Sequence, residues 1–389
     1  MLKTVKVNKK YFKKLDLSKI PSPCYVIDTK VIEDNLKIFN KLKTDTNVKI
    51  LLALKAFSLK NLFPIFSNVL DGVCASGINE AKLGKKYFGG LISTYSPAFK
   101  DTEFDDIMKY SQHITFNSIS QINKYRNICV NKNINFGVRI NPLYSEVDIL
   151  KYNSSNLNSR LGIHINQLDK LDFTDIKGIH FHSLCEQNFD TLENTWNKIW
   201  PYLKNKVKKL EWINLGGGHH ITRSDYNLNK LTNFLIELKN KTNCQILLEP
   251  GEAIVFQSGV LVGEILDYIH GDNDKIPNIG ITDISPVCHM PDVIEAPYRP
   301  LLMNEPTHGK KVLLGGPSCL AGDVIGEYNF LKKPNIGDKV VFLDQAHYTL
   351  VKTNFFNGIN HPEVILWNSE SNDLKIIKSF DFKDFETRN

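Results

Sequence analysis

Residues 50–57 read ILLALKAF, a run of apolar residues interrupted by one lysine, Lys55. Its length and composition predict a β-strand. Seven similar runs follow before residue 251, so we expect eight strands in this part of the chain. They are Val48–Lys55, Asp71–Ala75, Leu91–Tyr95, His113–Asn117, Phe136–Ile140, Lys177–His182, Glu211–Gly216 and Gln245–Pro250.

Segments with helical periodicity or helix-forming composition separate these runs. They include Asn79–Tyr87, Thr102–Tyr110, Ser120–Asn131, Thr191–Lys204 and Leu228–Lys241. Strands that alternate with helices form βα units with parallel pairing, and eight such units predict a (β/α)8 TIM barrel. An open, doubly wound sheet is the alternative.

The pattern changes after residue 251, where short β-type runs are punctuated by Gly, Pro and Asn. These runs are Val260–Leu266, Lys311–Leu314, Lys339–Leu343 and Val364–Trp367. They indicate a mostly β second domain, which the N-terminal run Cys24–Asp28 can join, because Ile32–Leu42 would then be the first helix. We therefore expect an α/β barrel over residues 29–255 and a β-rich domain from residues 1–28 and 256–389.

Composition excludes several classes of protein. Of the 389 residues, 42% are hydrophobic and 23% charged, which excludes a disordered chain. The net charge of +6 is too small to indicate nucleic-acid binding. No run approaches the roughly 20 apolar residues of a membrane span, and the basic N-terminus lacks the apolar segment of a signal peptide. Seven scattered cysteines without a CxxC pair favour a reducing cytoplasm over a disulfide framework or zinc site.

Chemically capable residues stand at the ends of the predicted strands, where barrel enzymes carry their active sites. A lysine at the end of a buried strand can be a nucleophile with a lowered pKa, although most lysines are surface charges. A carboxylate in the interior needs a partner, which is either a structural ion pair or a ring nitrogen of a cofactor. The strand-end residues are Lys55, Arg139, Asn141, His180, His182, Gly216, Gly217, Gly218 and Glu249.

The glycine triplet 216–218 has two interpretations. It is a tight turn, or it lets backbone amides approach a phosphate group, as at the late strand ends of many barrels. His180 and His182 also have two interpretations, because side chains two apart on a strand point the same way. They are packed core residues, or they bind a metal together with His219, His220 and Glu249.

A loop near the C-terminus, LLGGPSCLAGD at residues 313–323, contains Cys319 and Asp323. A cysteine in a loop is most simply a small apolar filler. The surrounding glycines and the nearby aspartate favour a reactive thiol instead.

Together these motifs resemble the fold-type III PLP-dependent decarboxylases, which are related to alanine racemase. The likeness spans PSPCYVID at residues 21–28 to NFFNG at 354–358. Within this superfamily the sequence is most similar to the carboxynorspermidine decarboxylases. The similar motifs are ALKAF, CASGINEAKLG, GIHFHSLCE, NLGGGHH, LEPGEA, CHMPDVIEAPYRP and GPSCLAGD.

The resemblance implies a role for each matching residue. Lys55 would bind pyridoxal 5′-phosphate (PLP) covalently, His182 would stack on its ring, and Glu249 would pair with the ring nitrogen. The glycines 216–218 and Tyr348 would hold or approach the phosphate, and Arg139 would lie near the ring. Because a glutamate faces the ring nitrogen, decarboxylation is favoured over racemisation.

The resemblance also implies an obligate homodimer with shared active sites. Cys319 of the partner subunit would return a proton to the substrate carbon, and the partner's Asp323 would lie near the substrate amine. The product would be a cationic polyamine, so carboxylates are expected around the substrate. The candidates are Asp323, Asp292, Glu295 and Glu186.

Four positions depart from the pattern of the wider family. Glu252 replaces the arginine of the EPGR motif that assists the phosphate elsewhere in the family. Leu320 replaces the glutamate of the CES motif of diaminopimelate decarboxylases, which argues against a second amino-acid head on the substrate. Cys185 replaces a serine, and Arg160 replaces the lysine of an SKFG-like motif.

Three alternatives stay open from the sequence. The chain could decarboxylate diaminopimelate, arginine or ornithine on the same scaffold. It could be a metal-dependent barrel hydrolase that uses the histidines. It could be a non-catalytic PLP-binding protein, although such proteins resemble the barrel alone.

Overall fold

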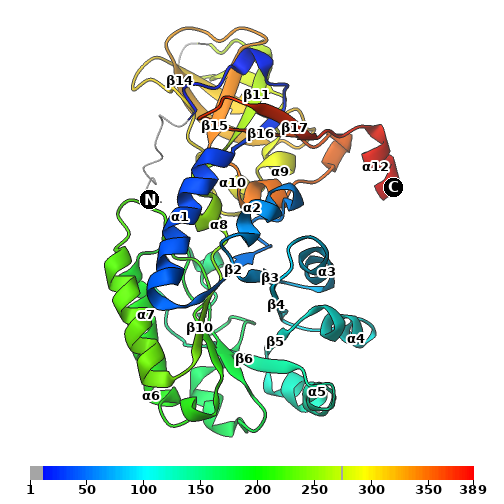
Figure 1. Cartoon of the computed structure of the whole chain (residues 1–389). Coiled ribbons are helices and arrows are strands. Elements are labelled where there is room, and N and C mark those ends of the chain that lie inside the picture. The colour runs from blue at the N-terminus through cyan, green and yellow to red at the C-terminus, as the bar shows by residue number, and fades with distance from the viewer. Residues whose placement is uncertain (1–11, 273–274) are drawn as a thin grey trace. The chain divides into compact units, whose positions relative to one another are not determined.

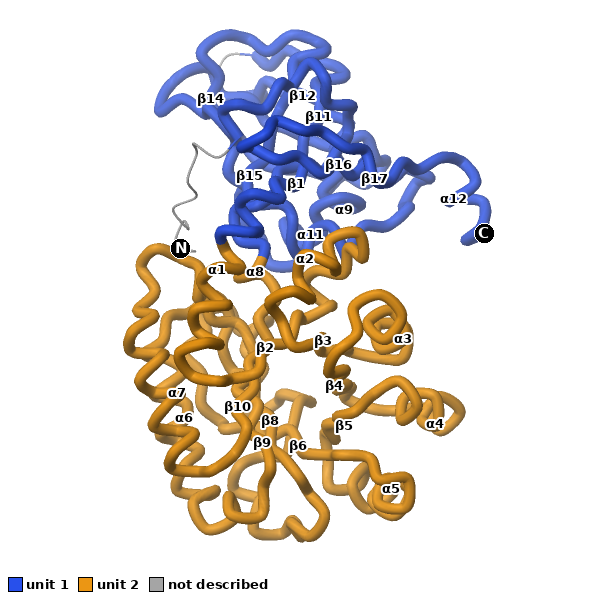
Figure 2. Tube along the Cα trace, in the orientation of Figure 1, with its two compact units in different colours: residues 1–34, 255–389 blue, residues 35–254 orange. Residues whose placement is uncertain are grey.

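The computed structural model describes residues 12–272 and 275–389. The chain divides into two compact units (Figure 2). One spans residues 35–254, and the other is formed by the residues up to 34 together with 255–389. Helix α1 (Thr29–Thr46) crosses the first division. The sequence placed the divisions at residues 28/29 and 255/256, and these domain boundaries stay a prediction.

The unit over residues 35–254 is a closed barrel of eight parallel strands. Each strand pairs with the next, and the pairings β10–β2 and β5–β6 close the ring. The predicted (β/α)8 barrel is therefore confirmed, and the open sheet is wrong. The strands are β2 (Lys49–Ala53), β3 (Gly72–Ala75), β4 (Leu91–Tyr95), β5 (His113–Phe116), β6 (Asn135–Asn141), β8 (Gly178–His180), β9 (Trp212–Asn214) and β10 (Gln245–Leu248).

Amphipathic helices surround this ring. Figure 1 shows α3, α4 and α5 along one side of it and α6 and α7 along another. Helix α6 buries an apolar stripe that includes Leu192, Trp196 and Ile199, with the 3–4 residue spacing that predicted a helix here. The helices are α2 (Phe63–Ser67), α3 (Ile78–Tyr87), α4 (Asp101–Tyr110), α5 (Ile119–Asn131), α6 (Phe189–Leu203), α7 (Leu228–Thr242) and α8 (Glu252–Val255).

A tryptophan fills the barrel at the amino ends of the strands. Gly137, Gly178 and Trp212 are direct neighbours in register across β6, β8 and β9. A Cβ atom on either glycine would overlap the indole of Trp212. The indole stacks on the ring of His113, with centroids 5.0 Å apart, and its Nε1 donates a hydrogen bond to Oδ1 of Asn135 at 2.7 Å. The two missing side chains thus make room for one large ring.

The other unit is β-rich, as expected. Its sheet has the order β14-β13-β12-β11-β1-β16-β17, and β15 pairs with β11. Strand β1 pairs antiparallel with β11 and parallel with β16, so the N-terminal run joins this sheet. The strands are β1 (Cys24–Asp28), β11 (Gly259–Ile269), β12 (Asn278–Thr282), β13 (Lys310–Gly315), β14 (Val324–Phe330), β15 (Lys339–Leu343), β16 (Glu363–Trp367) and β17 (Leu374–Lys378).

The core of this unit comes from alternating inward side chains of four strands, with Phe12, Leu15 and Ile20 packed against them. The inward residues of β1 and β11 are Cys24, Val26, Val260 and Val262, and those of β15 and β16 include Val341, Leu343, Ile365 and Trp367. Small helices connect the strands, namely α9 (Pro286–His289), α10 (Asp292–Glu295) and α11 (Tyr348–Val351), and α12 (Phe382–Arg388) follows the last strand. No helix in the described part of the chain is long and apolar enough to cross a membrane.

Candidate active site at the carboxyl end of the barrel

The strand-end residues named by the sequence gather within the barrel unit. Lys55 lies on the turn directly after β2, and Glu249 follows the last residue of β10. His180 is the last residue of β8. Electrostatic interactions connect Lys55 with Arg139 and Glu249, and connect His182 with Lys55. The barrel therefore brings these side chains into one site.

Arg139, His180 and Asn214 form a row across the barrel interior. Arg139 is the register partner of His180, and His180 is the register partner of Asn214. Each lies two residues after Gly137, Gly178 and Trp212, so the row stands one layer above the indole on the same, inner face. Arg139, His180 and Asn214 are all buried. The sequence did not single out Asn214.

Glu249 is anchored on two sides. Its Oε1 accepts a hydrogen bond from Nδ2 of Asn214 at 2.7 Å, and its backbone amide donates to the carbonyl of Gly216 at 2.8 Å. Its Oε2 lies 3.3 Å from Nε2 of His180. Burial alone would raise the pKa of Glu249, but His180, Asn214 and Lys55 outweigh it and lower the pKa. The carboxylate is therefore ionised at neutral pH.

Lys55 reaches solvent although protein groups surround it. Desolvation, with a further contribution from Arg139, lowers its pKa. Cys74, on β3, is close to both Lys55 and Glu249, and burial raises the pKa of its thiol well above the usual value. A lysine with a lowered pKa beside an uncharged thiol provides a neutral amine more readily than a surface lysine does.

His182 is held as a neutral ring. Its Nδ1 accepts a hydrogen bond from the backbone amide of Gly217 at 3.1 Å. Desolvation, with Lys55 and Arg139, lowers the pKa of His182 well below its usual value. The remaining proton is then on Nε2, and an uncharged imidazole can lie flat on an aromatic ring.

The glycine triplet provides close backbone approach. Gly216 and Gly218 have φ angles of +71° and +86°, and a Cβ on Gly218 would overlap the carbonyl of Leu184. The amide of Gly216 donates to Oδ1 of Asn214 at 2.9 Å, and that of Gly217 is used by His182. Of the three amides, that of Gly218 makes no hydrogen bond within the described chain, so its N–H is available to a ligand.

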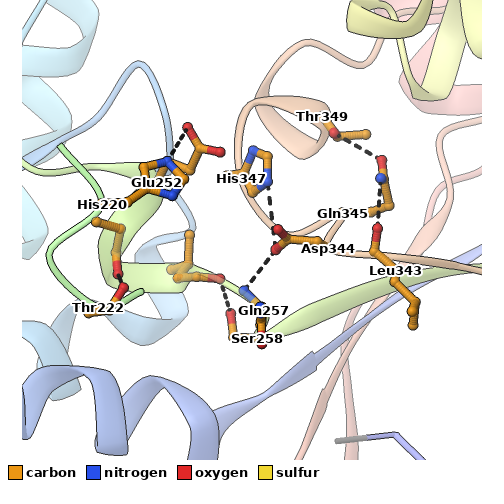
Figure 3. A network of polar contacts seen from close by, with 12 residues as sticks. His220, Thr222, Glu252, Gln257, Ser258, Leu343, Asp344, Gln345, His347 and Thr349 are labelled. Atoms are coloured by element: carbon orange, nitrogen blue, oxygen red, sulfur yellow. Dashed lines mark hydrogen bonds and ion pairs between the residues drawn. The ribbon is translucent and has the colours of Figure 1, made fainter. Parts of the chain in front are cut away.

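Glu252, which replaces the arginine of the EPGR motif, pairs with a histidine (Figure 3). Nε2 of His220 and Oε2 of Glu252 are 3.6 Å apart, and the side chains are 2% and 18% exposed. Burial alone would lower the pKa of His220, but Glu252 outweighs it and raises the pKa. Figure 3 also shows a separate cluster of the β-rich unit, in which Oδ1 of Asp344 accepts from the amide of Gln257 at 2.7 Å.

Each of these histidines therefore contacts a different side chain. Nδ1 of His219 lies 2.8 Å from the hydroxyl of Tyr226, while His180 and His220 face different glutamates. Among residues 12–272 and 275–389, no group of three or more His, Cys, Asp or Glu side chains is arranged to hold a metal ion.

In the β-rich unit, Cys319 lies exposed on the loop between β13 and β14. Its amide donates to Oδ1 of Asn357 at 2.8 Å. Asp323 is buried, and its carboxylate accepts from the hydroxyl of Ser285 at 2.8 Å and from the amide of Ser318 at 3.1 Å. These bonds give Asp323 a part in shaping the loop that carries Cys319.

Two of the expected substrate carboxylates share a lysine. Nζ of Lys352 lies 2.5 Å from Oδ1 of Asp292 and 2.9 Å from Oε2 of Glu295, and the ammonium group also lies 6.0 Å from the ring centroid of Tyr348. Lys352 could not be identified from the sequence, because it stands 60 residues from Asp292. Glu186 is in the barrel unit instead, exposed and close enough to His220 to affect its pKa.

Comparison with known proteins identifies the family. The chain is 39% identical over 385 residues to the carboxynorspermidine/carboxyspermidine decarboxylase of Campylobacter jejuni, covering 95% of this chain and 99% of that protein. It belongs to that family of decarboxylases. A crystal structure of carboxynorspermidine decarboxylase from Campylobacter jejuni, complexed with norspermidine, superposes with a TM-score of 0.86 at 37% identity and covers 95% of this chain and all of that one.

A second relative is named for a different substrate. The carboxyaminopropylagmatine decarboxylase of Synechocystis is 35% identical over 378 residues, 96% of each chain. Diaminopimelate decarboxylase from Helicobacter pylori shares the fold, with a TM-score of 0.84 at 15% identity and coverage of 96% of this chain and 98% of that one. No family model matches the chain. Membership places the chain among the fold-type III decarboxylases, which generally depend on PLP.

Proposed function

We propose that this chain uses PLP to decarboxylate carboxynorspermidine or carboxyspermidine, releasing norspermidine or spermidine. The single observation that carries the proposal is the anchored carboxylate of Glu249, beside the amine of Lys55, in a chain 39% identical to a named decarboxylase of these substrates. Turnover of carboxyaminopropylagmatine is the second candidate, since a relative at 35% identity carries that name.

The residues of the barrel fit PLP. Lys55 offers a primary amine for the aldehyde, and the ionised carboxylate of Glu249 suits a protonated ring nitrogen. His182 offers a neutral flat ring. Gly218 offers an open amide to a phosphate group, while Gly216 and Gly217 let the backbone approach closely. We assign Arg139 and Tyr348 to the cofactor's surroundings on the resemblance.

When bound, PLP supplies an electron sink for the charge that remains on the substrate carbon as carbon dioxide departs. The chain's own groups support this chemistry. Glu249 would hold a proton at the ring nitrogen of bound PLP, since its carboxylate stays ionised. Lys55 would hold the cofactor, and its lowered pKa favours the neutral amine that this role requires.

We propose that Cys319 returns the proton to the substrate carbon and that it does so in the barrel of a partner subunit, which makes the enzyme a homodimer. Its exposure on a loop supports a role outside its own core. Asp323 supports this role by holding the loop, and we retain it as a candidate near the substrate amine.

We propose Asp292, Glu295 and Glu186 as carboxylates for the ammonium groups of the substrate. Lys352 supports this proposal for the first two, because they already hold one primary ammonium between them. A substrate ammonium has the same charge and hydrogen-bonding capacity as the Lys352 side chain.

The deciding experiment is a substrate panel. Purified protein and PLP are mixed with carboxynorspermidine, carboxyspermidine, carboxyaminopropylagmatine, meso-diaminopimelate, ornithine or arginine, and carbon dioxide and the amine product are measured. Turnover of the carboxylated polyamines supports the proposal. Exclusive turnover of diaminopimelate, ornithine or arginine would overturn the substrate assignment, and failure with every compound would overturn the function.

A further inference from the structure

His180 has no role in the chemistry described above, although it lies in the middle of the site. Its side chain is 4% exposed, between Arg139 on one neighbouring strand and Asn214 on the other. Nδ1 has no hydrogen-bond partner within the described chain, and Nε2 is engaged by the 3.3 Å contact with Glu249. Buried polar groups without partners are rare and costly, and they cluster where function requires them.

The groups that face His180 come from three strands and from the residue that follows a fourth. Nε2 lies 3.3 Å from Oε2 of Glu249. The ring of Tyr95, from β4, has its centroid 5.6 Å away at a tilt of 59°, and the guanidinium of Arg139 lies over the same tyrosine ring, 4.7 Å from its centroid. Tyr95 itself is tied down, because its hydroxyl donates to Oδ1 of Asn117 at 2.7 Å. His180 therefore lies close to both a fixed aromatic ring and the carboxylate.

The carboxylate of Glu249 needs a second contact to fix its orientation. Asn214 fixes Oε1, but a carboxylate held by one oxygen can still rotate about its last bond. Nε2 of His180 lies against Oε2, and the thiol of Cys74 also contacts this carboxylate. Burial lowers the pKa of His180, and Arg139 and Lys55 act in the same direction, so the ring is neutral at neutral pH. A neutral imidazole can direct its one proton toward Oε2 without neutralising the carboxylate.

We propose that His180 is a positioning residue that, with Asn214, fixes the carboxylate of Glu249 in the direction of a cofactor ring nitrogen. The inference rests on the proposed PLP-dependent decarboxylation and adds a residue to it. His180 touches neither the substrate nor the cofactor in this proposal. It acts through Glu249.

The test compares three variants with the wild type as holoenzymes. His180→Phe keeps the ring and removes both nitrogens, and His180→Gln returns an N–H donor near the place of Nε2. His113→Phe is the matched control, since it is the same substitution of a partly buried histidine on another strand of the barrel, β5, at the opposite end. The measurements are the PLP dissociation constant, kcat and KM, the pH profile of kcat, and the thermal unfolding midpoint.

In His180→Phe we expect kcat to fall about tenfold and the PLP dissociation constant to rise about fivefold, with KM changed less than about twofold. The acid limb of its kcat profile moves to higher pH, because Glu249 loses a group that lowers its pKa. His180→Gln recovers most of both losses, and His113→Phe shows neither.

Two results would overturn the inference. One is a His180→Phe enzyme with the wild-type kcat, PLP affinity and pH profile. The other is a His180→Gln enzyme as impaired as His180→Phe with the same drop in unfolding midpoint, which would make the residue a packing element. If the wild type itself fails to bind PLP or to release carbon dioxide, the proposed function fails rather than this assignment.

Discussion

The backbone of Gly217 passes so close to Glu249 that a Cβ atom on Gly217 would overlap the carbonyl oxygen of Glu249. The same glycine donates its amide to His182. One residue without a side chain therefore sets the distance between the end of β10 and the ring proposed to stack on the cofactor.

The first prediction follows from this contact. Gly217→Ala forces the two strand ends apart, so we expect the unfolding free energy to fall by about 1–3 kcal/mol and PLP binding to weaken at least about tenfold. Thermal unfolding and PLP titration measure the two effects. Gly77→Ala is the control, because a Cβ there meets nothing within 4 Å. Equal behaviour of both variants would show that the close approach is unimportant.

Lys55 is predicted to be indispensable. Lys55→Ala removes the amine that would bind PLP, and kcat should fall by about three orders of magnitude or more. Carbon dioxide release and the visible absorption of bound cofactor report the loss. Lys49→Ala, at the exposed start of the same strand, should behave as the wild type. An active Lys55→Ala enzyme with an unchanged spectrum would refute the assignment.

Shared sites predict complementation between two inactive chains. Lys55→Ala and Cys319→Ala subunits, coexpressed in equal amounts, should recover about a quarter of the wild-type activity, because half of the dimers are mixed and each has one intact site. As a control, Cys319→Ala is mixed with the Lys55→Ala/Cys319→Ala double variant, which can form no intact site. Activity of the first mixture no higher than that of its separate chains would argue against sites completed by a partner.

The His220–Glu252 pair predicts a pH-dependent contribution to stability. Glu252 raises the pKa of His220 above its ordinary 6.5, so the folded chain favours the protonated ring. The contribution is fully present below the ordinary pKa and is lost as the pH rises through the raised one. The difference in unfolding midpoint between wild type and Glu252→Gln should thus be largest near about pH 6 and shrink toward about pH 9.

The control for this pH series is Glu211→Gln, which breaks the exposed Lys177–Glu211 pair of the same unit. Lysine does not titrate in this range, so that difference should stay flat. A constant difference for Glu252→Gln as well would mean that His220 does not titrate between the two pH values.

Asp292 is predicted to contribute to substrate affinity. Asp292→Asn removes one charge from the pair that holds Lys352, and KM for the carboxylated polyamine should rise about tenfold with kcat changed less than about twofold. Glu327→Gln is the control, because Glu327 pairs with the exposed Lys311 in the same unit. Steady-state kinetics with the best substrate of the panel decide, and an unchanged KM would remove Asp292 from the binding site.

Much of the barrel could be predicted because its strands are continuous apolar runs and its helices have long periodic patterns. The β-rich unit was harder. Strands β12, β14 and β17 were missed, since β14 contains Gly326, Glu327 and Asn329, and β17 reads LKIIK with exposed side chains. Such strands form because a neighbour offers unpaired backbone groups, which no local pattern reveals.

The site shows the same limit. Lys55 and Glu249 could be named because polar residues at the ends of apolar runs are conspicuous, and a strand end in a barrel is where chemistry is expected. Asn214 was missed, although its place two residues before the glycine turn was a usable signal. The pairings of Glu252 with His220 and of Asp292 with Lys352 join distant segments, so they emerge only from the folded chain.

Trp212, which fills the barrel at the amino ends of the strands, restricts how this sequence can change during evolution. Trp212 takes the space of side chains at Gly137 and Gly178, so the three positions share one volume. A larger residue at either glycine is tolerable only together with a smaller one at position 212, and the reverse order leaves a cavity. Substitutions here should be strongly epistatic, and related sequences should vary at these three positions together or not at all.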